Sequence, residues 1–184
     1  MEKNISSILL TGIPGVGKTT IIVKKLIKIF NEKHIKCIGF FTEEMRSENG
    51  IRIGFDVVDV NGKRGVLARE HPTDNIRRPH VGKYSVYTKD FEDIALPMLK
   101  IEAKTILIVD EIGKMELLSK KFKQRIEEVF GKTLILATIP NRQTIDIVEK
   151  IRSDHSSLVL EITKKNRNEI VDEIFQKINQ MLTI

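Results

Sequence analysis

A glycine-rich segment near the start of the chain has the residue types and the spacing that bind phosphate. It matches the pattern GxxxxGK[ST] at every fixed position, with a short apolar run before it and an amphipathic stretch after it. Glycines permit the tight curve in which backbone N–H groups point inward at phosphate oxygens. The segment that we expect to contact a nucleotide comprises Gly12, Ile13, Pro14, Gly15, Val16, Gly17, Lys18, Thr19 and Thr20.

Two side chains of this segment carry the chemistry. Lys18 supplies a mobile positive charge for the β- and γ-phosphates, and we expect it to be catalytic. The Thr19 hydroxyl is a hard oxygen ligand suited to Mg²⁺. A helix that begins near Lys18 adds the positive end of its dipole. The segment therefore predicts that the chain binds a nucleoside triphosphate together with Mg²⁺.

Two adjacent carboxylates follow the apolar run 106–109 and resemble a Walker B motif. In P-loop enzymes an aspartate at such a strand end holds Mg²⁺, so Asp110 is the second candidate metal ligand, beside Thr19. Glu111 lies one residue further, where a carboxylate can orient a water and accept its proton. The alternative is that both residues only end the strand and cap the next turn.

Three functions stay open at this point. The first is hydrolysis of the nucleotide, the second is a nucleotide or small-molecule kinase, and the third is a nucleic-acid-linked ATPase. A kinase must exclude water and seat a second substrate, so a carboxylate placed for water favours hydrolysis. The net charge of +6 suits a nucleic acid partner, but aromatic residues make up only 5% and tryptophan is missing, so base stacking has little support.

Further residues are candidates for supporting roles. Lys114 could reach the phosphates or brace the acidic pair, and Thr138 could sense the γ-phosphate from the end of its strand. Arg167 is the residue we expect against the base, because a flat guanidinium stacks on any ring. Glu43 and Glu44 could face the site from a neighbouring strand end. The arginines that could act as an arginine finger are Arg46, Arg77, Arg78, Arg142 and Arg167.

Alternating strands and helices predict one α/β domain over residues 1–184. We expect a three-layer sandwich with a mostly parallel sheet and helices on both faces. Asn49-Gly50 and Asn61-Gly62 predict type I′ turns in an antiparallel hairpin meander inserted at 38–70, and residues 71–83 are interpreted as a loop. The residues expected to cap helices are Asp90, Ser119, and the pair Asn166 and Glu169 in a capping box, while Pro97 is expected to kink or shorten its helix.

The ends and the apolar runs of the chain bear on its location. The first apolar run breaks at Gly12, too early for a signal peptide, and no run approaches the ~18 apolar residues of a membrane span. Cys37 is the only cysteine, which suits a reducing compartment. We expect a cytoplasmic monomer without a membrane partner.

Several segments resemble the nucleoside-triphosphatases first described from thermophiles, which include cancer-related relatives in animals. The resemblance spans nearly the whole chain, and VDEIGKMEL is its most specific part. It implies a P-loop NTPase fold and hydrolysis of ATP, GTP, CTP and UTP to the diphosphate and phosphate. Pro140 departs from the family, in which many members have a histidine there. The segments are TGIPGVGKTT, GFFTEEMR, RIGFDVVDVNGKRGVLAR, VGKYSVY, VDEIGKMEL and Asn166-Arg167.

Overall fold

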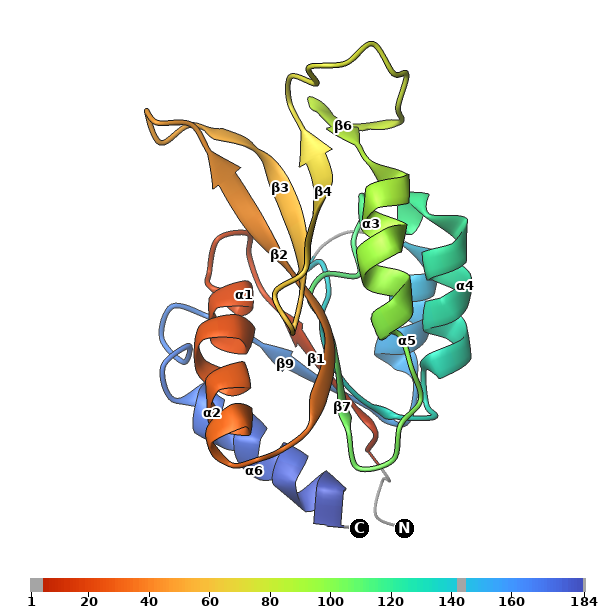
Figure 1. The fold of residues 1–184 in the computed structure, drawn as a ribbon. Helices are drawn as coiled ribbons and strands as arrows, with labels where there is room; N and C mark the ends of the chain where they lie inside the picture. Colours follow the sequence, from red (N-terminus) through yellow and green to blue (C-terminus); the bar gives the residue numbers. More distant parts are fainter. Residues whose placement is uncertain (1–4, 142–144, 184) are drawn as a thin grey trace.

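One mixed sheet separates two groups of helices in the computed structural model, which describes residues 5–141 and 145–183 (Figure 1). Within these residues, nine strands pair in the order β5-β6-β4-β3-β2-β7-β8-β1-β9. The strands are β1 (Ser7–Thr11), β2 (Cys37–Arg46), β3 (Arg52–Asp59), β4 (Arg64–Arg69), β5 (His80–Val81), β6 (Tyr84–Val86), β7 (Ile106–Val109), β8 (Leu134–Thr138) and β9 (Ser157–Glu161).

The helices cover both faces of the sheet, with a buried apolar cluster under each group. One face carries α1 (Lys18–Thr20), a π-helix (Ile21–Leu26), α2 (Ile27–Glu32) and α6 (Ile170–Thr183). The other carries α3 (Thr88–Ala95), α4 (Lys120–Val129) and α5 (Asp146–Ser153), while short 3₁₀ turns lie at Leu96–Met98 and Glu116–Leu118.

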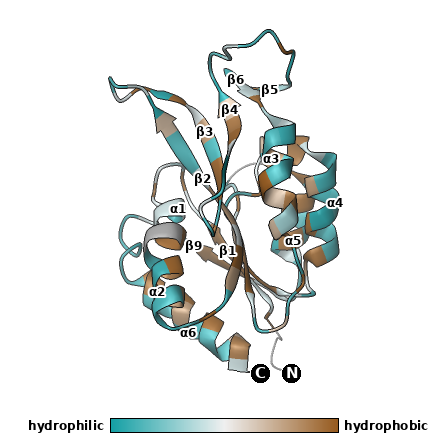
Figure 2. Cartoon of the chain, in the orientation of Figure 1, coloured by the Kyte–Doolittle hydropathy of each residue, from teal (hydrophilic) through white to brown (hydrophobic). Residues whose placement is uncertain are grey.

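The parallel half of the sheet consists of β2, β7, β8, β1 and β9. Along β1, Ile8 and Leu10 belong to one apolar cluster and Leu9 to the other, and all three are fully buried. Because both faces are covered, such strands are continuous apolar runs (brown in Figure 2). The predicted α/β architecture with helices on both faces is confirmed.

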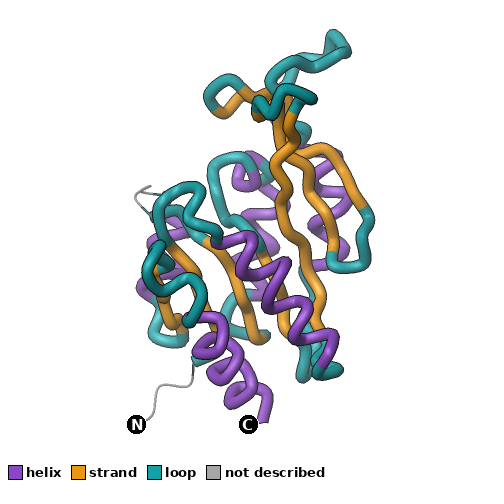
Figure 3. The backbone as a smooth tube through the Cα atoms, turned by 90° about the vertical axis from the view of Figure 1, so that its left-hand side faces the viewer, coloured by secondary structure: helices purple, strands orange, loops and turns teal. Residues whose placement is uncertain are grey.

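The antiparallel half extends the same sheet and does not form a separate insertion. β2 pairs with β7 through Cys37–Phe40 and then continues beyond it to pair with β3. Strands β3, β4, β6 and β5 follow, so the hairpins project past the layer of helices (Figure 3). The predicted loop at 71–83 is wrong at its end, because His80–Val81 forms β5 against β6.

The two predicted hairpins are present, but their turn type is wrong. Type I′ turns require positive φ at both central residues. Among the described residues, positive φ outside glycine occurs only at His34, Lys104 and Glu111. Gly50 and Gly62 alone supply the left-handed residue, with φ of 75° and 92°. The connections are longer than two residues, so one glycine is enough to reverse the chain.

Three of the helix-end predictions can be checked directly. Ser119 caps α4 as predicted, because its Oγ accepts a hydrogen bond from the Phe122 N–H at 3.0 Å. Asp90 does not cap α3, which begins at Thr88. The capping box is also wrong, since the Asn166 side chain accepts instead from the Thr163 N–H at 2.8 Å.

The helix before Pro97 ends where the sequence indicated. α3 stops at Ala95, and the proline lies in the 3₁₀ turn that follows. Across the described residues, no helix is both long and apolar enough to span a lipid bilayer.

Candidate functional site

The glycine-rich loop connects β1 to the first helix with three left-handed glycines. Gly12, Gly15 and Gly17 have φ values of 147°, 76° and 109°. A Cβ on Gly12 would lie 2.4 Å from the Ile162 carbonyl oxygen, so only glycine fits there. A Cβ on Gly15 or Gly17 would meet no atom within 4 Å, so that part of the curve faces open space.

The helix after the loop begins without a side-chain cap. Gly17 is the N-cap residue, and its neighbours in α1 therefore keep backbone N–H groups available to an anion. The helix then passes through the π-helical turns Ile21–Leu26, a geometry often found at functional sites. The predicted loop-to-helix arrangement is thus present, with the dipole directed at the curve.

Lys18 folds back over the loop. Its Nζ donates hydrogen bonds to the carbonyl oxygens of Gly12 at 2.8 Å and Ile13 at 3.4 Å. Burial lowers the pKa of Lys18, and the charges of Glu111 and Asp110 oppose that change. The Lys18 ammonium therefore lies near both carboxylates, although Asp110 and Glu111 are more than ninety positions away from Lys18 in the chain.

Asp110 directly follows β7 and is completely buried. Its Oδ1 accepts from the Thr138 hydroxyl at 2.9 Å and its Oδ2 from the Thr42 N–H at 3.3 Å. The three residues meet because β2, β7 and β8 are parallel neighbours. β7 and β8 end at this point, and β2 continues past it through Thr42. Burial raises the pKa of Asp110, while hydrogen bonds from Thr19, Thr138 and Thr42 and the charge of Lys18 lower it.

The donor atoms around Asp110 fit Mg²⁺. Thr19 and Asp110 provide a hydroxyl and a carboxylate, the hard oxygens that this ion prefers. Among the described residues, no basic side chain forms a direct ion pair with Asp110, and Lys18 acts on it only through its nearby charge. The described residues also contain no group of three His, Cys, Asp or Glu placed to hold a metal. Mg²⁺ is commonly bound through one or two protein ligands and its own waters.

Glu111 adopts a strained backbone beside this aspartate. Its φ is 86°, which is rare outside glycine and typical of functional positions. The residue is exposed, yet protein atoms crowd its carboxyl. This desolvation and the charge of Asp110 raise the pKa of Glu111, and the charge of Lys18 lowers it.

A cavity of about 150 Å³ opens beside Glu111. We call it the Glu111 cavity. The predicted residue Lys114 lies on its wall, so the structure brings this lysine to the acidic pair. Its lining residues are Thr42, Phe55, Leu67, Val81, Glu111, Lys114, Met115 and Glu116.

Sequence reasoning missed Glu116, a second carboxyl on this cavity beside Glu111. The residue is 3% exposed and begins the 3₁₀ turn after the acidic pair. Burial and the charge of Glu111 raise the pKa of Glu116 well above its usual value. The available signal was a single glutamate between apolar Met115 and Leu117 in the family-specific segment VDEIGKMEL.

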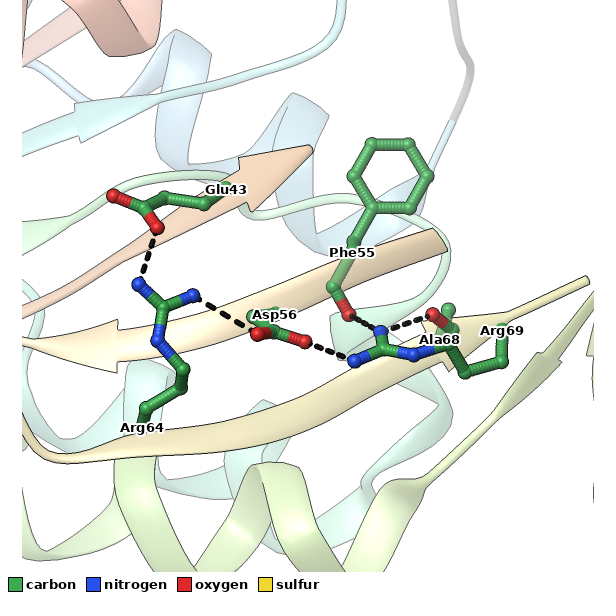
Figure 4. Close-up of polar contacts among 6 residues, drawn as sticks. All are labelled: Glu43, Phe55, Asp56, Arg64, Ala68 and Arg69. Carbon is green, nitrogen blue, oxygen red and sulfur yellow. Dashed lines mark hydrogen bonds and ion pairs between the residues drawn. The ribbon is translucent and has the colours of Figure 1, made fainter. Parts of the chain in front are cut away.

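Several candidate residues are engaged elsewhere. Glu43 pairs with Arg64 at 2.5 Å, and Glu44 pairs with Arg46 and Arg52 (Figure 4 shows the first pair). Two candidate arginine fingers, Arg46 and Arg78, are occupied: the first donates to Glu44, and the second pairs with Asp74 and stacks on Tyr87. Arg77 is exposed, and Arg142 lies outside the described residues.

Arg167 lies exposed in the segment between β9 and α6. Two contacts attach this segment to the loop region: Ile162 touches Gly12, and the Asn168 Oδ1 accepts from the Lys25 Nζ at 3.3 Å. Arg167 therefore belongs to the same end of the sheet as the glycine-rich loop.

The fold and the loop together define the class of this chain, a P-loop α/β protein. A family model described as NTPase matches residues 7–175. The nucleoside-triphosphatase THEP1 of Thermotoga maritima is 44% identical over 170 residues, covering 91% of this chain and 92% of the relative. The cancer-related nucleoside-triphosphatase of Homo sapiens is 40% identical over 179 residues, covering 91% of this chain and 93% of the relative.

Solved structures agree with these sequence matches. The crystal structure of THEP1 from the hyperthermophile Aquifex aeolicus superposes with a TM-score of 0.80 at 35% identity, covering 94% of this chain and 98% of that one. The solution structure of a human cancer-related nucleoside triphosphatase gives 0.81 at 38% identity, covering 95% and 97%. The chain belongs to this NTPase family, and the resemblance indicated by its sequence motifs is confirmed.

Proposed function

We propose that the chain is a Mg²⁺-dependent nucleoside-triphosphatase that converts a nucleoside triphosphate and water to the diphosphate and phosphate. The observation that carries the proposal is that the charged groups of Lys18, Asp110 and Glu111 lie near one another beside the glycine-rich loop. The names of the relatives, which are nucleoside-triphosphatases, support it.

The loop binds and orients the triphosphate. Backbone N–H groups of the glycine-rich loop surround the phosphate oxygens, except at Pro14, which has no N–H. The Lys18 ammonium leaves its carbonyl acceptors for the β- and γ-phosphates. Thr19 and Asp110 would hold Mg²⁺, whose charge neutralises the phosphate oxygens when it is bound. The hydrogen bonds from Thr42 and Thr138 keep the Asp110 carboxylate at a fixed angle.

Glu111 activates the water. The water oxygen forms a bond to the γ-phosphorus, the bond to the bridging oxygen breaks, and the electron pair leaves with the nucleoside diphosphate. Glu111 accepts the proton that the water loses. Its raised pKa brings this carboxyl closer to neutral pH, where a general base transfers protons most effectively.

Base specificity is proposed to be loose. Backbone contacts to phosphates carry no base information, and Arg167 is exposed near the loop, where its guanidinium can stack on any ring. Phosphate release is therefore expected at measurable kcat/KM for both the purine triphosphates ATP and GTP and the pyrimidine triphosphates CTP and UTP. Discrimination above about 10⁴-fold would require a hydrogen-bonding pocket for one base and contradict this part.

Two substitutions test the division of roles between the acidic residues. Glu111→Gln keeps the size of the side chain but cannot accept a proton, so kcat is expected to fall ~10²–10⁴-fold while the Kd of a non-hydrolysable analogue stays near the wild-type value. Asp110→Asn weakens the hold on Mg²⁺, so its phosphate release is expected to recover partly as Mg²⁺ is raised. Near-normal kcat in Glu111→Gln, or equal Mg²⁺ responses of both variants, would contradict the mechanism.

The Glu111 cavity favours one second candidate, phosphoryl transfer to a small acceptor. Its volume of about 150 Å³ and its apolar wall of Phe55, Leu67 and Val81 offer room for an acceptor hydroxyl beside Glu111. Candidate acceptors added to the reaction distinguish the two functions. A phosphorylated acceptor formed in place of free phosphate would identify a kinase.

A further inference from the structure

Glu116 has no role in the mechanism above, yet it lies deeper in the site than Glu111. It is 3% exposed and lines the same cavity as Glu111 and Lys114. A buried carboxyl is costly unless it is paired, hydrogen-bonded or protonated. Among the described residues, Glu116 forms no ion pair with a basic side chain. Its place in the molecule therefore needs an explanation.

Gly113 lies next to the carboxyls of both Glu116 and Glu111. A Cβ on this glycine would lie 3.0 Å from the Glu116 Oε2 and 3.1 Å from the Glu111 Oε1. The two oxygens are thus separated by no more than these distances combined, which permits a direct hydrogen bond or one bridging water. A side chain at position 113 would fill the space between them. The absence of a Cβ leaves the space between the two carboxyls open.

Two carboxylates this close cannot both carry a charge without strong repulsion. The buried member of the pair is the one that keeps a proton, because its charged form loses more hydration. That member is Glu116, which is 3% exposed, whereas Glu111 is exposed. The raised pKa of Glu116, caused by burial and then by Glu111, agrees with this assignment, although the N–H groups of Glu116 and Gly113 oppose it.

Resting on the proposed hydrolysis, we propose that Glu116 is a positioning residue whose protonated carboxyl donates a hydrogen bond, directly or through one water, to Glu111 and so holds the charged Glu111 toward the attacking water. The donor fixes one Glu111 oxygen and leaves the other for the water.

Rescue by the conservative variant tests this role. Glu116→Gln is permanently neutral and keeps an N–H donor, so kcat is expected within about threefold of wild type near pH 7. Glu116→Leu has similar bulk and no donor, so kcat is expected to fall about 10–100-fold, as for other displaced catalytic groups, with the Kd of a non-hydrolysable analogue unchanged. Glu116→Met repeats the test should the leucine variant fail to fold.

The pH profile gives a second readout. Wild-type kcat is expected to decline at alkaline pH as Glu116 loses its proton, and Glu116→Gln is expected to lose this decline. The charged groups that face Glu116 are Glu111, Asp110 and Lys114, while the cavity wall from β2 to β5 is uncharged. Asp56→Asn is a matched control, because it alters a buried carboxylate in the hairpins and is expected to lower stability without changing kcat.

The outcomes separate the inference from the proposed function. Normal kcat in Glu116→Leu would overturn the positioning role, and a glutamine variant as slow as the leucine variant would show that the charged form is needed. Both results are interpreted against two reference measurements. The wild-type protein must hydrolyse NTP, and Glu111→Gln must have a kcat that is ~10²–10⁴-fold lower. Failure of either of those two reference measurements would instead contradict the proposed function.

Discussion

The two halves of the sheet each bury an aspartate, and they treat its charge differently. Asp56 in the antiparallel hairpins accepts from the Arg64 Nη1 at 2.9 Å and the Arg69 Nη2 at 2.5 Å, and Glu43 extends the network (Figure 4). Asp110 at the end of the parallel strands has only hydroxyl and N–H partners. Both are nearly inaccessible, with exposures of 4% and 0%.

The difference indicates what each half is for. In the hairpins, cations of the chain itself neutralise the buried charge, so the network orders β2, β3 and β4 against one another. At the end of the parallel strands, the carboxyls of Asp110, Glu111 and Glu116 form no direct ion pair with a basic side chain of the described residues. Burial shifts the pKa of each of these carboxyls, and of the nearby Lys18, away from its usual value. Perturbed groups that gather at strand ends are typical of functional sites.

The largest expected effect is the loss of activity in Lys18→Ala. Removing the charge that meets the β- and γ-phosphates is expected to lower kcat by about 10²-fold or more. Stability should not fall, because burial already lowers the pKa of Lys18 and so disfavours its charged form in the folded protein. Phosphate release and a thermal melt of the nucleotide-free protein check both halves. Activity within threefold of wild type would remove the loop from the mechanism.

Asp56→Ala is expected to show the opposite pattern. Deleting the shared acceptor leaves Arg64 and Arg69 without their buried partner, which typically costs about 3–5 kcal/mol of unfolding free energy. The value should lie toward the lower end, because Arg64 is 46% exposed. Urea unfolding measures the loss, and kcat of the folded fraction is expected to stay unchanged. A large loss of kcat would mean that the hairpin network also serves the site.

Stability of the Mg²⁺-free protein is expected to depend on pH through Glu116. Its pKa in the folded protein is raised well above 4.5, so the folded state binds this proton more tightly than the unfolded state. The contribution is therefore present at low pH and is lost as pH rises from about 4.5 through the raised value. Glu116→Gln removes this loss, so it should unfold at higher urea than wild type at about pH 8 and at equal urea near pH 4. A constant difference across pH would argue against a raised pKa.

The smallest effect is expected for Glu44→Ala. Glu44 joins Arg46 and Arg52, but its side chain is 37% exposed and those of the arginines are 53% and 43% exposed. Exposed pairs contribute about 0–1 kcal/mol, so unfolding free energy should change by less than about 1 kcal/mol. Normal kcat is also expected, because Glu44 is paired away from the acidic residues. A strong loss of activity would restore the earlier hypothesis that Glu44 faces the site.

Local patterns were sufficient for the loop, the strand ends and most elements. The glycine-rich loop is contiguous in sequence, so its spacing alone predicted a tight curve permitted by glycines and a helix that begins near Lys18. In the structure the curve has three left-handed glycines and the helix begins at Lys18. The alternation of β1 side chains between the two apolar clusters and the Ser119 cap also depend on neighbours within a few positions. Such features follow from backbone geometry, which short sequence windows encode.

The sequence predictions were wrong where more than one local arrangement suits the same residues. Asn49 and Asn61 can adopt positive φ, but the longer connections let Gly50 and Gly62 meet that requirement alone. Asn166 has the spacing of a capping box, but its side chain finds nearer partners in the segment after β9.

The sequence by itself determined a P-loop α/β chain and singled out Lys18, Asp110 and Glu111 as the candidate chemical groups, because each lies in a short motif of fixed spacing. Only the tertiary structure decided what surrounds them. Thr42 lies 68 positions from Asp110, and no local pattern relates the two. The pairing of β2, β7 and β8 brings them together, and the fold around Gly113 buries Glu116 beside Glu111. Burial is a property of the whole packed chain, so the shifted pKa values that distinguish this site arise only when distant segments exclude water together.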